Sequence, residues 1–206
     1  MRLILVRHGE TIWNAARRYQ GVSDVPLSAR GAHQAQRLAA RLATESIHLV
    51  YSSDLDRAWQ TAARIAAEHG VPVRAEPRLR EMDFGEWEGL TYAEIQERQP
   101  QALARWERDP SGVAPPGGEH LMHLAARVQA MLEGLRQHND AETVLLVSHG
   151  GPLRVLLCLA LGLAPSEHWC FRLDPGSVSE LYLYPQGAII ALLNDRHHLM
   201  EDPDGG

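Results

Sequence analysis

The chain has 206 residues, of which 45% are hydrophobic and 22% are charged, and its formal net charge is −6. This size suits one well-packed domain, and the negative charge argues against nucleic acid as a partner. No apolar stretch approaches the roughly 20 residues that cross a bilayer, and the first residues lack a signal-peptide pattern, so we expect a cytoplasmic protein without a membrane partner.

Strands and helices alternate along the chain, which predicts an α/β fold: a three-layer α/β/α sandwich with a mostly parallel sheet. Six segments are expected as strands: 2–6, 49–51, 73–75, 143–147, 179–184 and 189–193. The long helices are expected at 29–44, 56–68, 121–137 and 152–161. A Pro-Gln-Gly turn joins the last two strands, which favours an antiparallel pair at one end of the sheet.

Residues at the predicted helix ends are typical caps. Ser28 is expected to cap the helix 29–44, and either Asp54 or Asp56 the helix 56–68, which Gly70 should end. Cys158 lies within an apolar helical run and is expected to be a buried thiol, and Cys158 and Cys170 have neither a metal-binding nor a redox spacing.

Segment 85–119 differs from its surroundings because it carries Trp87, Tyr92 and Trp106 among charged residues and ends in prolines and a glycine pair. It predicts two short helices, 92–98 and 101–108, followed by a loop. We interpret it as a lid or cap excursion within a single domain that spans 1–206. Its aromatic side chains suit packing or substrate contact equally well. The tail 201–206 is expected to be frayed.

Two histidines follow apolar strands. His8 comes after the apolar run 3–6 and is followed by a glycine. His149 comes after the strand 143–147, with a serine before it and a glycine after it. Ligands of open α/β sheets bind at the carboxyl ends of strands. The arrangement therefore predicts two imidazoles that face one pocket.

Such a pocket suits chemistry at phosphorus. A neutral imidazole is a competent nucleophile, because its ordinary pKa is about 6.5. All 20 basic residues are arginine, so a lysine-containing phosphate loop and a Schiff-base mechanism are excluded. One guanidinium group can donate two hydrogen bonds to a phosphate at once. Arg7 and Arg57 lie beside predicted strand ends.

Four segments, in this order, resemble the signature motifs of the histidine phosphatase superfamily, in the branch of phosphoglycerate mutases and related phosphatases. They are LVRHGET at 5–11, YSSDLDRA at 51–58, LREMDFGEWEG at 79–89 and VSHGG at 147–151. The resemblance covers nearly the whole chain.

The resemblance implies a role for each matching residue. His8 takes the phosphoryl group as a phosphohistidine, and Glu81 gives a proton to the leaving alcohol and later draws one from water. His149 joins them as the third catalytic residue, next to the phosphate. The other implied phosphate contacts are Arg7, Asn14, Arg57 and Gly150. Because arginines and histidine supply the positive charge, we expect neither a metal nor another cofactor.

The expected reaction is hydrolysis. Family mutases carry a long insertion between the acid motif and the second histidine motif, whereas the chain between Glu81 and His149 is short. A small lid also cannot protect a phosphohistidine from water. Segment 82–91 is similar to that of α-ribazole phosphatases, although it recurs in bisphosphatase-like and broad-specificity members. The leading substrate is α-ribazole 5′-phosphate; the alternative is phosphoglycerate mutase or sugar (bis)phosphatase activity.

Two hypotheses from other classes stay open. A metal-dependent hydrolase also uses two histidines and a carboxylate, although its ligands usually lie closer together in sequence. A second group of histidines, His120, His123 and His138, also lacks the tight spacing of metal ligands. A non-catalytic phosphate-binding module is the other. The expected partner is a small phosphorylated substrate, and the helix 152–161 and the terminal strands are compatible with a homodimer.

Overall fold

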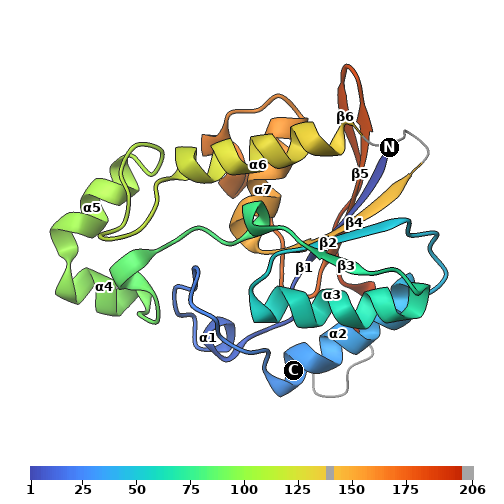
Figure 1. The fold of residues 1–206 in the computed structure, drawn as a ribbon. Coiled ribbons are helices and arrows are strands. Elements are labelled where there is room, and N and C mark those ends of the chain that lie inside the picture. Colours follow the sequence, from blue (N-terminus) through green and yellow to red (C-terminus); the bar gives the residue numbers. More distant parts are fainter. Residues whose placement is uncertain (138–141, 201–206) are drawn as a thin grey trace.

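The computed structural model describes residues 1–137 and 142–200 (Figure 1). His138 and the tail 201–206 lie outside the described residues. One six-stranded sheet forms the centre of the molecule. Its strands are β1 (Arg2–Arg7), β2 (Leu49–Ser52), β3 (Val73–Ala75), β4 (Thr143–Ser148), β5 (Val178–Tyr184) and β6 (Gly187–Asp195).

The sheet has the order β3-β2-β4-β1-β5-β6. The pairs β2–β3, β2–β4 and β1–β4 are parallel, whereas β5 is antiparallel to both β1 and β6. The expected mostly parallel sheet with an antiparallel pair at one end is thus confirmed. Both strands of that pair are longer than the sequence predicted, because backbone pairing extends from Tyr184 and Gly187 at the turn to Val178 and Asp195 at the other end.

Helices cover both faces of the sheet (Figure 1). Alternate residues of β4 decide which helices lie on which side: Val144 and Leu146 pack in the core beneath α6 and α7, and Leu145 and Val147 in the core beneath α2 and α3. The three-layer α/β/α sandwich is confirmed. These helices are α2 (Ala29–Leu42), α3 (Asp56–His69), α6 (Leu121–Leu135) and α7 (Gly150–Ala160).

The predicted helix ends hold in part. The Ser28 hydroxyl accepts the Gly31 N–H at 3.0 Å, and Gly70 ends α3 with a φ of 64°. The prediction that Asp54 or Asp56 caps α3 is wrong. The cap position is Leu55, whose side chain cannot accept a hydrogen bond. The Asp54 carboxylate is paired with Arg80 instead.

Three differences affect the site. α7 begins at Gly150 rather than at 152, so the helix starts immediately after His149. A single turn, α1 (Ile12–Ala15), and a 3₁₀ segment, η3 (Pro165–Cys170), were not predicted, because both are too short to show a helical period. The remaining 3₁₀ segments are η1 (Pro77–Leu79), η2 (Gly85–Trp87) and η4 (His197–Leu199).

Segment 85–119 stands beside the sandwich, at the left of Figure 1. It contains η2, α4 (Tyr92–Arg98) and α5 (Pro100–Arg108), the last starting one residue before its predicted start. Trp87, Ile95 and Leu103 form a small core of its own, and the Trp87 Nε1–H donates to Gln99 Oε1 at 2.7 Å. Trp87 is therefore a packing residue.

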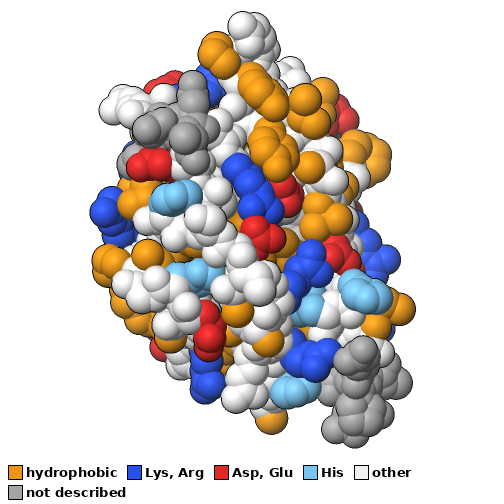
Figure 2. Space-filling view, turned by 90° about the vertical axis from the view of Figure 1, so that its right-hand side faces the viewer, with side chains coloured by type: hydrophobic (Ala, Val, Ile, Leu, Met, Phe, Trp, Pro, Cys, Tyr) orange, Lys and Arg blue, Asp and Glu red, His pale blue; other side chains and the backbone are white. Residues whose placement is uncertain are grey.

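Figure 2 views the molecule from the side on which β5 and β6 stand, and hydrophobic side chains gather on the upper part of this face. Ile189 and Leu193 of the edge strand β6 are 57% and 40% exposed. Cys158 is buried, as expected, and it and Cys170 are free thiols. Within the described ranges, no helix combines the length and the apolar character needed to cross a membrane.

Candidate active site

Three strands bring the site together at one edge of the sheet. Arg7 is in register with Ser148, and Ser52 with Val147, so the parallel strands β1, β4 and β2 end at the same level. The next residues of these strands are His8, His149 and Ser53. The two imidazole rings lie edge to face with their centroids 4.9 Å apart. The predicted meeting of two strand-end histidines is confirmed.

His8 is held as a neutral imidazole. Its Nδ1 lies 2.7 Å from the carbonyl oxygen of Gly9. Since a carbonyl only accepts, Nδ1 carries the proton and Nε2 keeps its lone pair. Burial, followed by the positive charges of Arg57 and Arg7, holds the pKa of His8 well below its ordinary value of 6.5. The ring is therefore unprotonated at Nε2 near neutral pH.

His149 is neutral for the same reasons, with the opposite tautomer. The Arg57 Nε–H donates to His149 Nδ1 at 3.1 Å, so the proton of the ring lies on Nε2, which donates to Ser53 Oγ at 2.8 Å. Burial and the charge of Arg57 lower the pKa of His149 well below 6.5. The single N–H of the second imidazole is thus bound to Ser53.

Arg57 is fully buried although it is charged. Besides its bond to His149, it donates from Nη1 to Ser23 O at 2.9 Å and from Nη2 to Gly21 O at 2.6 Å. A guanidinium has five N–H donors, so two remain for a ligand. Two carbonyls and an imidazole therefore fix the plane of this cation before any ligand binds.

Arg7 is the second cation next to the imidazoles. Its Nη1 donates to Leu173 O at 2.6 Å, whereas its buried Nε has no hydrogen-bond partner within the described residues. Burial lowers the pKa of Arg7 to about 10, so the group stays protonated at neutral pH. A buried donor without a partner is costly, and a phosphate oxygen would satisfy it.

The side chain of Glu81 reaches the N-terminus of α7. Both carboxylate oxygens accept the Gly151 N–H at 3.1 Å, and Oε1 also accepts the Met82 N–H at 2.9 Å. The first N–H groups of a helix attract anions, and here they hold the carboxylate. A Cβ at position 151 would lie 2.2 Å from Glu81 Oε1, so this contact requires glycine. Gly150 opens the helix beside Arg7.

Asn14, expected from the sequence to contact the phosphate, makes hydrogen bonds with the N-cap residue of α1. It is the third residue of α1, where its Oδ1 accepts the Thr11 N–H at 3.1 Å and its own N–H donates to Thr11 Oγ1 at 3.1 Å. This is a capping box. Only its amide NH₂ could bind a phosphate, and that role stays a prediction.

A cavity of about 270 Å³ reaches Arg7, Glu81 and Gly150, whereas His8, His149 and Arg57 are not among its lining residues. Its walls combine one carboxylate, Glu81, with the cationic or titratable side chains Arg7, Arg154 and His168. Three aromatic side chains complete it: Tyr19, Phe84 and Trp106. The shape is that of a pocket for a small molecule, in which a few polar groups face apolar walls.

The sequence did not single out Tyr19, Arg154 or His168 as site residues. A signal existed for Arg154, which lies one helical turn after Gly150 and therefore on the same face of α7. Its buried Nε also has no hydrogen-bond partner within the described part of the chain. Tyr19 and His168 lie in irregular or 3₁₀ segments, where no periodicity indicates which way a side chain points.

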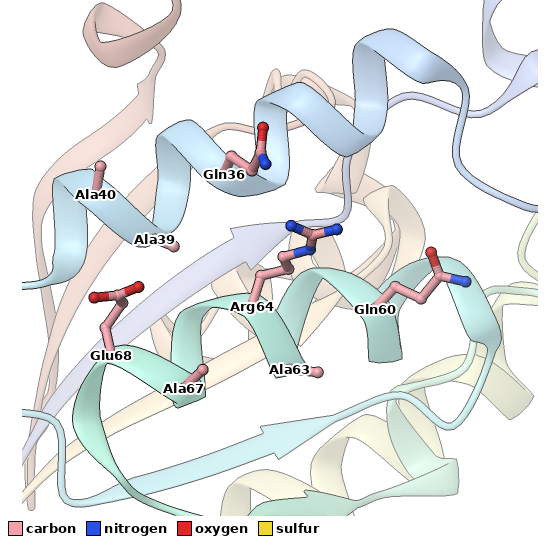
Figure 3. Close-up of a pocket in the computed structure, with 8 residues that line it drawn as sticks. All are labelled: Gln36, Ala39, Ala40, Gln60, Ala63, Arg64, Ala67 and Glu68. Carbon is pink, nitrogen blue, oxygen red and sulfur yellow. The ribbon is translucent and has the colours of Figure 1, made fainter.

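A larger groove lies between α2 and α3 (Figure 3). It is lined by alanines and by longer polar side chains such as Arg64 and Glu68. None of the predicted site residues lines this groove. In residues 1–137 and 142–200, no group of three or more His, Cys, Asp or Glu side chains is placed to hold a metal ion.

Two neutral imidazoles, the buried guanidinium of Arg57, the partly buried guanidinium of Arg7 and a carboxylate lie together at the end of the parallel strands. This arrangement is suited to binding a phosphate group. The model of the histidine phosphatase superfamily (branch 1) matches residues 3–196. The chain belongs to this superfamily, as its motifs predicted.

The named relatives include phosphatases and a probable phosphoglycerate mutase of Yersinia enterocolitica, which is 38% identical over 88% of this chain and 84% of its own. Phosphoserine phosphatase 1 of Hydrogenobacter thermophilus is 39% identical over 201 residues, which cover 98% of this chain and 95% of the relative. Adenosylcobalamin/alpha-ribazole phosphatase of Escherichia coli is 34% identical over 95% of this chain and 97% of its own. The crystal structure of the alpha-ribazole phosphatase from Shigella flexneri superimposes with a TM-score of 0.89 at 34% identity, covering 95% and 96% of the two chains. The protein is a phosphatase.

The two neutral imidazoles predict that acid destabilises the fold. In the unfolded chain both histidines take up a proton below pH 6.5, whereas in the folded protein their pKa values lie well below that. The unfolded state therefore binds more protons, and the free energy of unfolding falls as the pH drops below about 6.5. The expected slope is up to about 1.4 kcal/mol per pH unit for each histidine. Urea unfolding between pH 5 and pH 7.5 measures it.

Controls separate these histidines from other groups. His8→Gln and His149→Gln should each flatten the slope, whereas His33→Gln, which changes an exposed histidine on α2, should keep it. A slope that both buried substitutions leave unchanged would contradict the neutral state of the pair.

Proposed function

We propose that the protein hydrolyses a small phosphomonoester in two steps. His8 Nε2 attacks phosphorus, the bond to the ester oxygen breaks, and the departing alkoxide takes a proton from Glu81. Water then gives a proton to Glu81 and attacks the phosphohistidine, which releases inorganic phosphate and restores His8. The observation that carries this proposal is the neutral His8, whose proton is held on Nδ1 by Gly9 O at 2.7 Å.

The charged groups around His8 support this division of work. Negative charge develops on the non-bridging phosphate oxygens, and the guanidinium groups of Arg7 and Arg57 are donors held in place beforehand. The Nε2–H of His149 now donates to Ser53 Oγ, and on binding it exchanges this acceptor for a phosphate oxygen. Glu81 and Arg7 line the same cavity. Full activity after exhaustive chelation would exclude a metal-dependent hydrolase.

We propose α-ribazole 5′-phosphate as the substrate. Its flat, bulky base suits the aromatic wall formed by Tyr19, Phe84 and Trp106. The relatives named for this activity add support. The short chain between Glu81 and His149 favours hydrolysis over the return of the phosphoryl group to a bound sugar acid.

A second candidate is a phosphate ester with another anionic group, and Arg154 favours it. This arginine and His168 line the cavity together with Arg7 and Glu81, and the buried Nε of Arg154 has no hydrogen-bond partner within the described residues. A carboxylate would fill that place. The relative named phosphoserine phosphatase makes L-phosphoserine the compound to test.

Values of kcat/KM for both esters, with the wild-type protein and Arg154→Gln, distinguish the candidates. We expect a higher kcat/KM for α-ribazole 5′-phosphate and only a small effect of Arg154→Gln on it. If a carboxylate binds at Arg154, the variant raises KM for phosphoserine about 10- to 100-fold, the size of one charge-assisted hydrogen bond. An equal or lower kcat/KM for the ribazole ester contradicts our choice.

The proposed partner is this small substrate, with neither nucleic acid nor a membrane, and the proposed location is the cytoplasm. For a homodimer, α7 is unsuitable because most of its residues are buried in the core. The edge strand β6, with its exposed Ile189 and Leu193, is the surface we propose for a second copy. Sedimentation of the wild type and of Ile189→Asp tests this assignment.

A further inference from the structure

Arg127, a half-buried residue on α6, binds the backbone of the loop that carries Glu81. Its Nη1 donates to the carbonyl oxygens of Arg78 at 2.8 Å and Arg80 at 2.5 Å. Its Nη2 donates to the carbonyl oxygen of Glu81 at 2.9 Å and to Glu119 Oε1 at 2.7 Å. One guanidinium thus spans the loop from Arg78 to Glu81.

Glu119 extends this contact to the far side of Glu81. Its Oε1 accepts the Asp83 N–H at 3.1 Å, and its own N–H donates to Asp83 O at 2.9 Å. The Arg127–Glu119 pair is largely shielded from water, with side chains only 21% and 19% exposed. Glu81 is therefore held between two fixed backbone points, the carbonyls bound by Arg127 and the peptide bound by Glu119.

This support matters because Glu81 belongs to no helix or strand. It lies between η1 and η2, so no ladder of backbone hydrogen bonds fixes its place. Its carboxylate rests on the Gly151 N–H of α7, whereas its backbone is tied to α6. The two helices pack against each other in one core. Arg127 therefore sets the position of the carboxylate relative to the reacting edge of the sheet.

We propose that Arg127 is a positioning residue for proton transfer by Glu81. The proposal rests on the proposed function, in which Glu81 protonates the leaving alcohol. A proton donor displaced by about 1 Å loses on the order of 100-fold in rate. We do not expect Arg127 itself to touch the phosphate or the leaving group, because it does not line the cavity and four of its five donors are used by carbonyls and by Glu119.

A positioning role predicts selectivity among leaving groups. An alkoxide needs a proton as it departs, whereas p-nitrophenolate leaves without one near neutral pH. Loss of Arg127 should therefore slow the cleavage of alkyl phosphates and leave that of p-nitrophenyl phosphate nearly unchanged. A purely structural defect would slow both esters together.

The experiment measures alcohol or phenol release in a single turnover, so that later hydrolysis of the phosphohistidine does not intervene. The esters are p-nitrophenyl phosphate and whichever of α-ribazole 5′-phosphate and phosphoserine is turned over faster. The variants are Arg127→Met, Arg127→Lys, Glu81→Gln as the reference and Arg136→Met as the control. Arg136 is an exposed arginine at the end of the same helix.

We expect Arg127→Met to slow the alkyl ester about 10- to 100-fold and the aryl ester less than about threefold. Arg127→Lys should recover part of the loss, because an ammonium reaches some of the same carbonyls, and Arg136→Met should match the wild type. If Arg127→Met does not fold, Arg127→Lys replaces it in the test. Its ratio of aryl-ester to alkyl-ester rate should then lie between the ratios of the wild type and of Glu81→Gln.

Two failures are distinguishable. If Glu81→Gln slows both esters equally, the assignment of Glu81 as the proton donor is wrong, and with it the proposed function. If Glu81→Gln is selective for the alkyl ester but the folded Arg127 variants slow both esters equally or neither, the positioning role of Arg127 is overturned.

Discussion

Replacing His8 with alanine should lower kcat by roughly 10⁴-fold or more, because the covalent route is lost together with its nucleophile. His8 is only 2% exposed, its ring lies 4.9 Å from that of His149, and the positive charges of Arg57 and Arg7 act on it. Other side chains offer no equivalent group, since the Nδ1 of His149 already accepts from Arg57. Steady-state kinetics with a phosphomonoester panel measures the loss.

Chemical labelling gives an independent readout of the same residue. A phosphoryl donor should label the wild-type protein at His8 through a bond that is labile in acid and stable in base, and His8→Ala should take no label. His33→Gln, an exposed substitution, is the matched control and should keep both label and turnover. Activity of His8→Ala within tenfold of the wild type would contradict the mechanism. A wild-type protein with neither label nor turnover would favour a phosphate-binding module.

The meeting of His8 and His149 could be predicted from the sequence because it depends on strand ends. Short apolar runs mark β1 and β4, and parallel strands in register bring their following residues to one edge. Arg57 follows from the same logic, since it lies in the first turn of α3, directly after β2. Residues that follow strand ends can therefore be predicted to lie close together before the fold is known.

Other parts of the site depend on contacts that no local pattern reports. Asp54 was a plausible helix cap, but its partner Arg80 is distant in sequence, and the ion pair prevailed. Arg127 looks like any polar residue of an amphipathic helix, although its partners are the carbonyls of the Glu81 loop. These arrangements arise only when α6 packs beside that loop.

Segment 85–119 shows the same limit for substrate choice. Its aromatic residues were equivalent in the sequence, yet Trp87 is fully buried in the small core of this segment, whereas Trp106 reaches the cavity wall. Tyr92 is 45% exposed and donates to Glu107 Oε1. Which aromatic side chain faces a substrate is decided by how α4 and α5 pack, and spacing alone does not contain that information.

Arg57→Met should cost both activity and stability. The substitution removes a preorganised cation from the phosphate and leaves Gly21 O, Ser23 O and His149 Nδ1 without their donor. We expect kcat/KM to fall about 10²- to 10³-fold, as when one donor to a developing charge is lost. The free energy of unfolding should fall by about 2 kcal/mol or more, because buried acceptors stay unpaired. Kinetics well below the melting temperature and urea unfolding measure the two losses separately.

A change in pH dependence identifies the electrostatic part of the loss. The charge of Arg57 is one cause of the low pKa of His8 and of His149, so its removal should raise both pKa values toward 6.5. The nucleophile then takes up a proton at a higher pH, and the acidic limb of kcat/KM should move to higher pH in Arg57→Met. Arg57→Lys keeps the charge and should keep that limb, although one ammonium cannot reach all three acceptors.

Arg64→Met is the matched control, since Arg64 lies on the same helix and on the rim of the groove between α2 and α3 (Figure 3). It should leave kcat/KM and the unfolding free energy near the wild-type values. If Arg57→Met kept kcat/KM within tenfold and its acidic limb did not move, Arg57 would be a structural cation rather than a phosphate donor. Its two remaining N–H groups and its place against His149 argue for the donor, because a purely structural role would not require a charged side chain in full burial beside two neutral imidazoles.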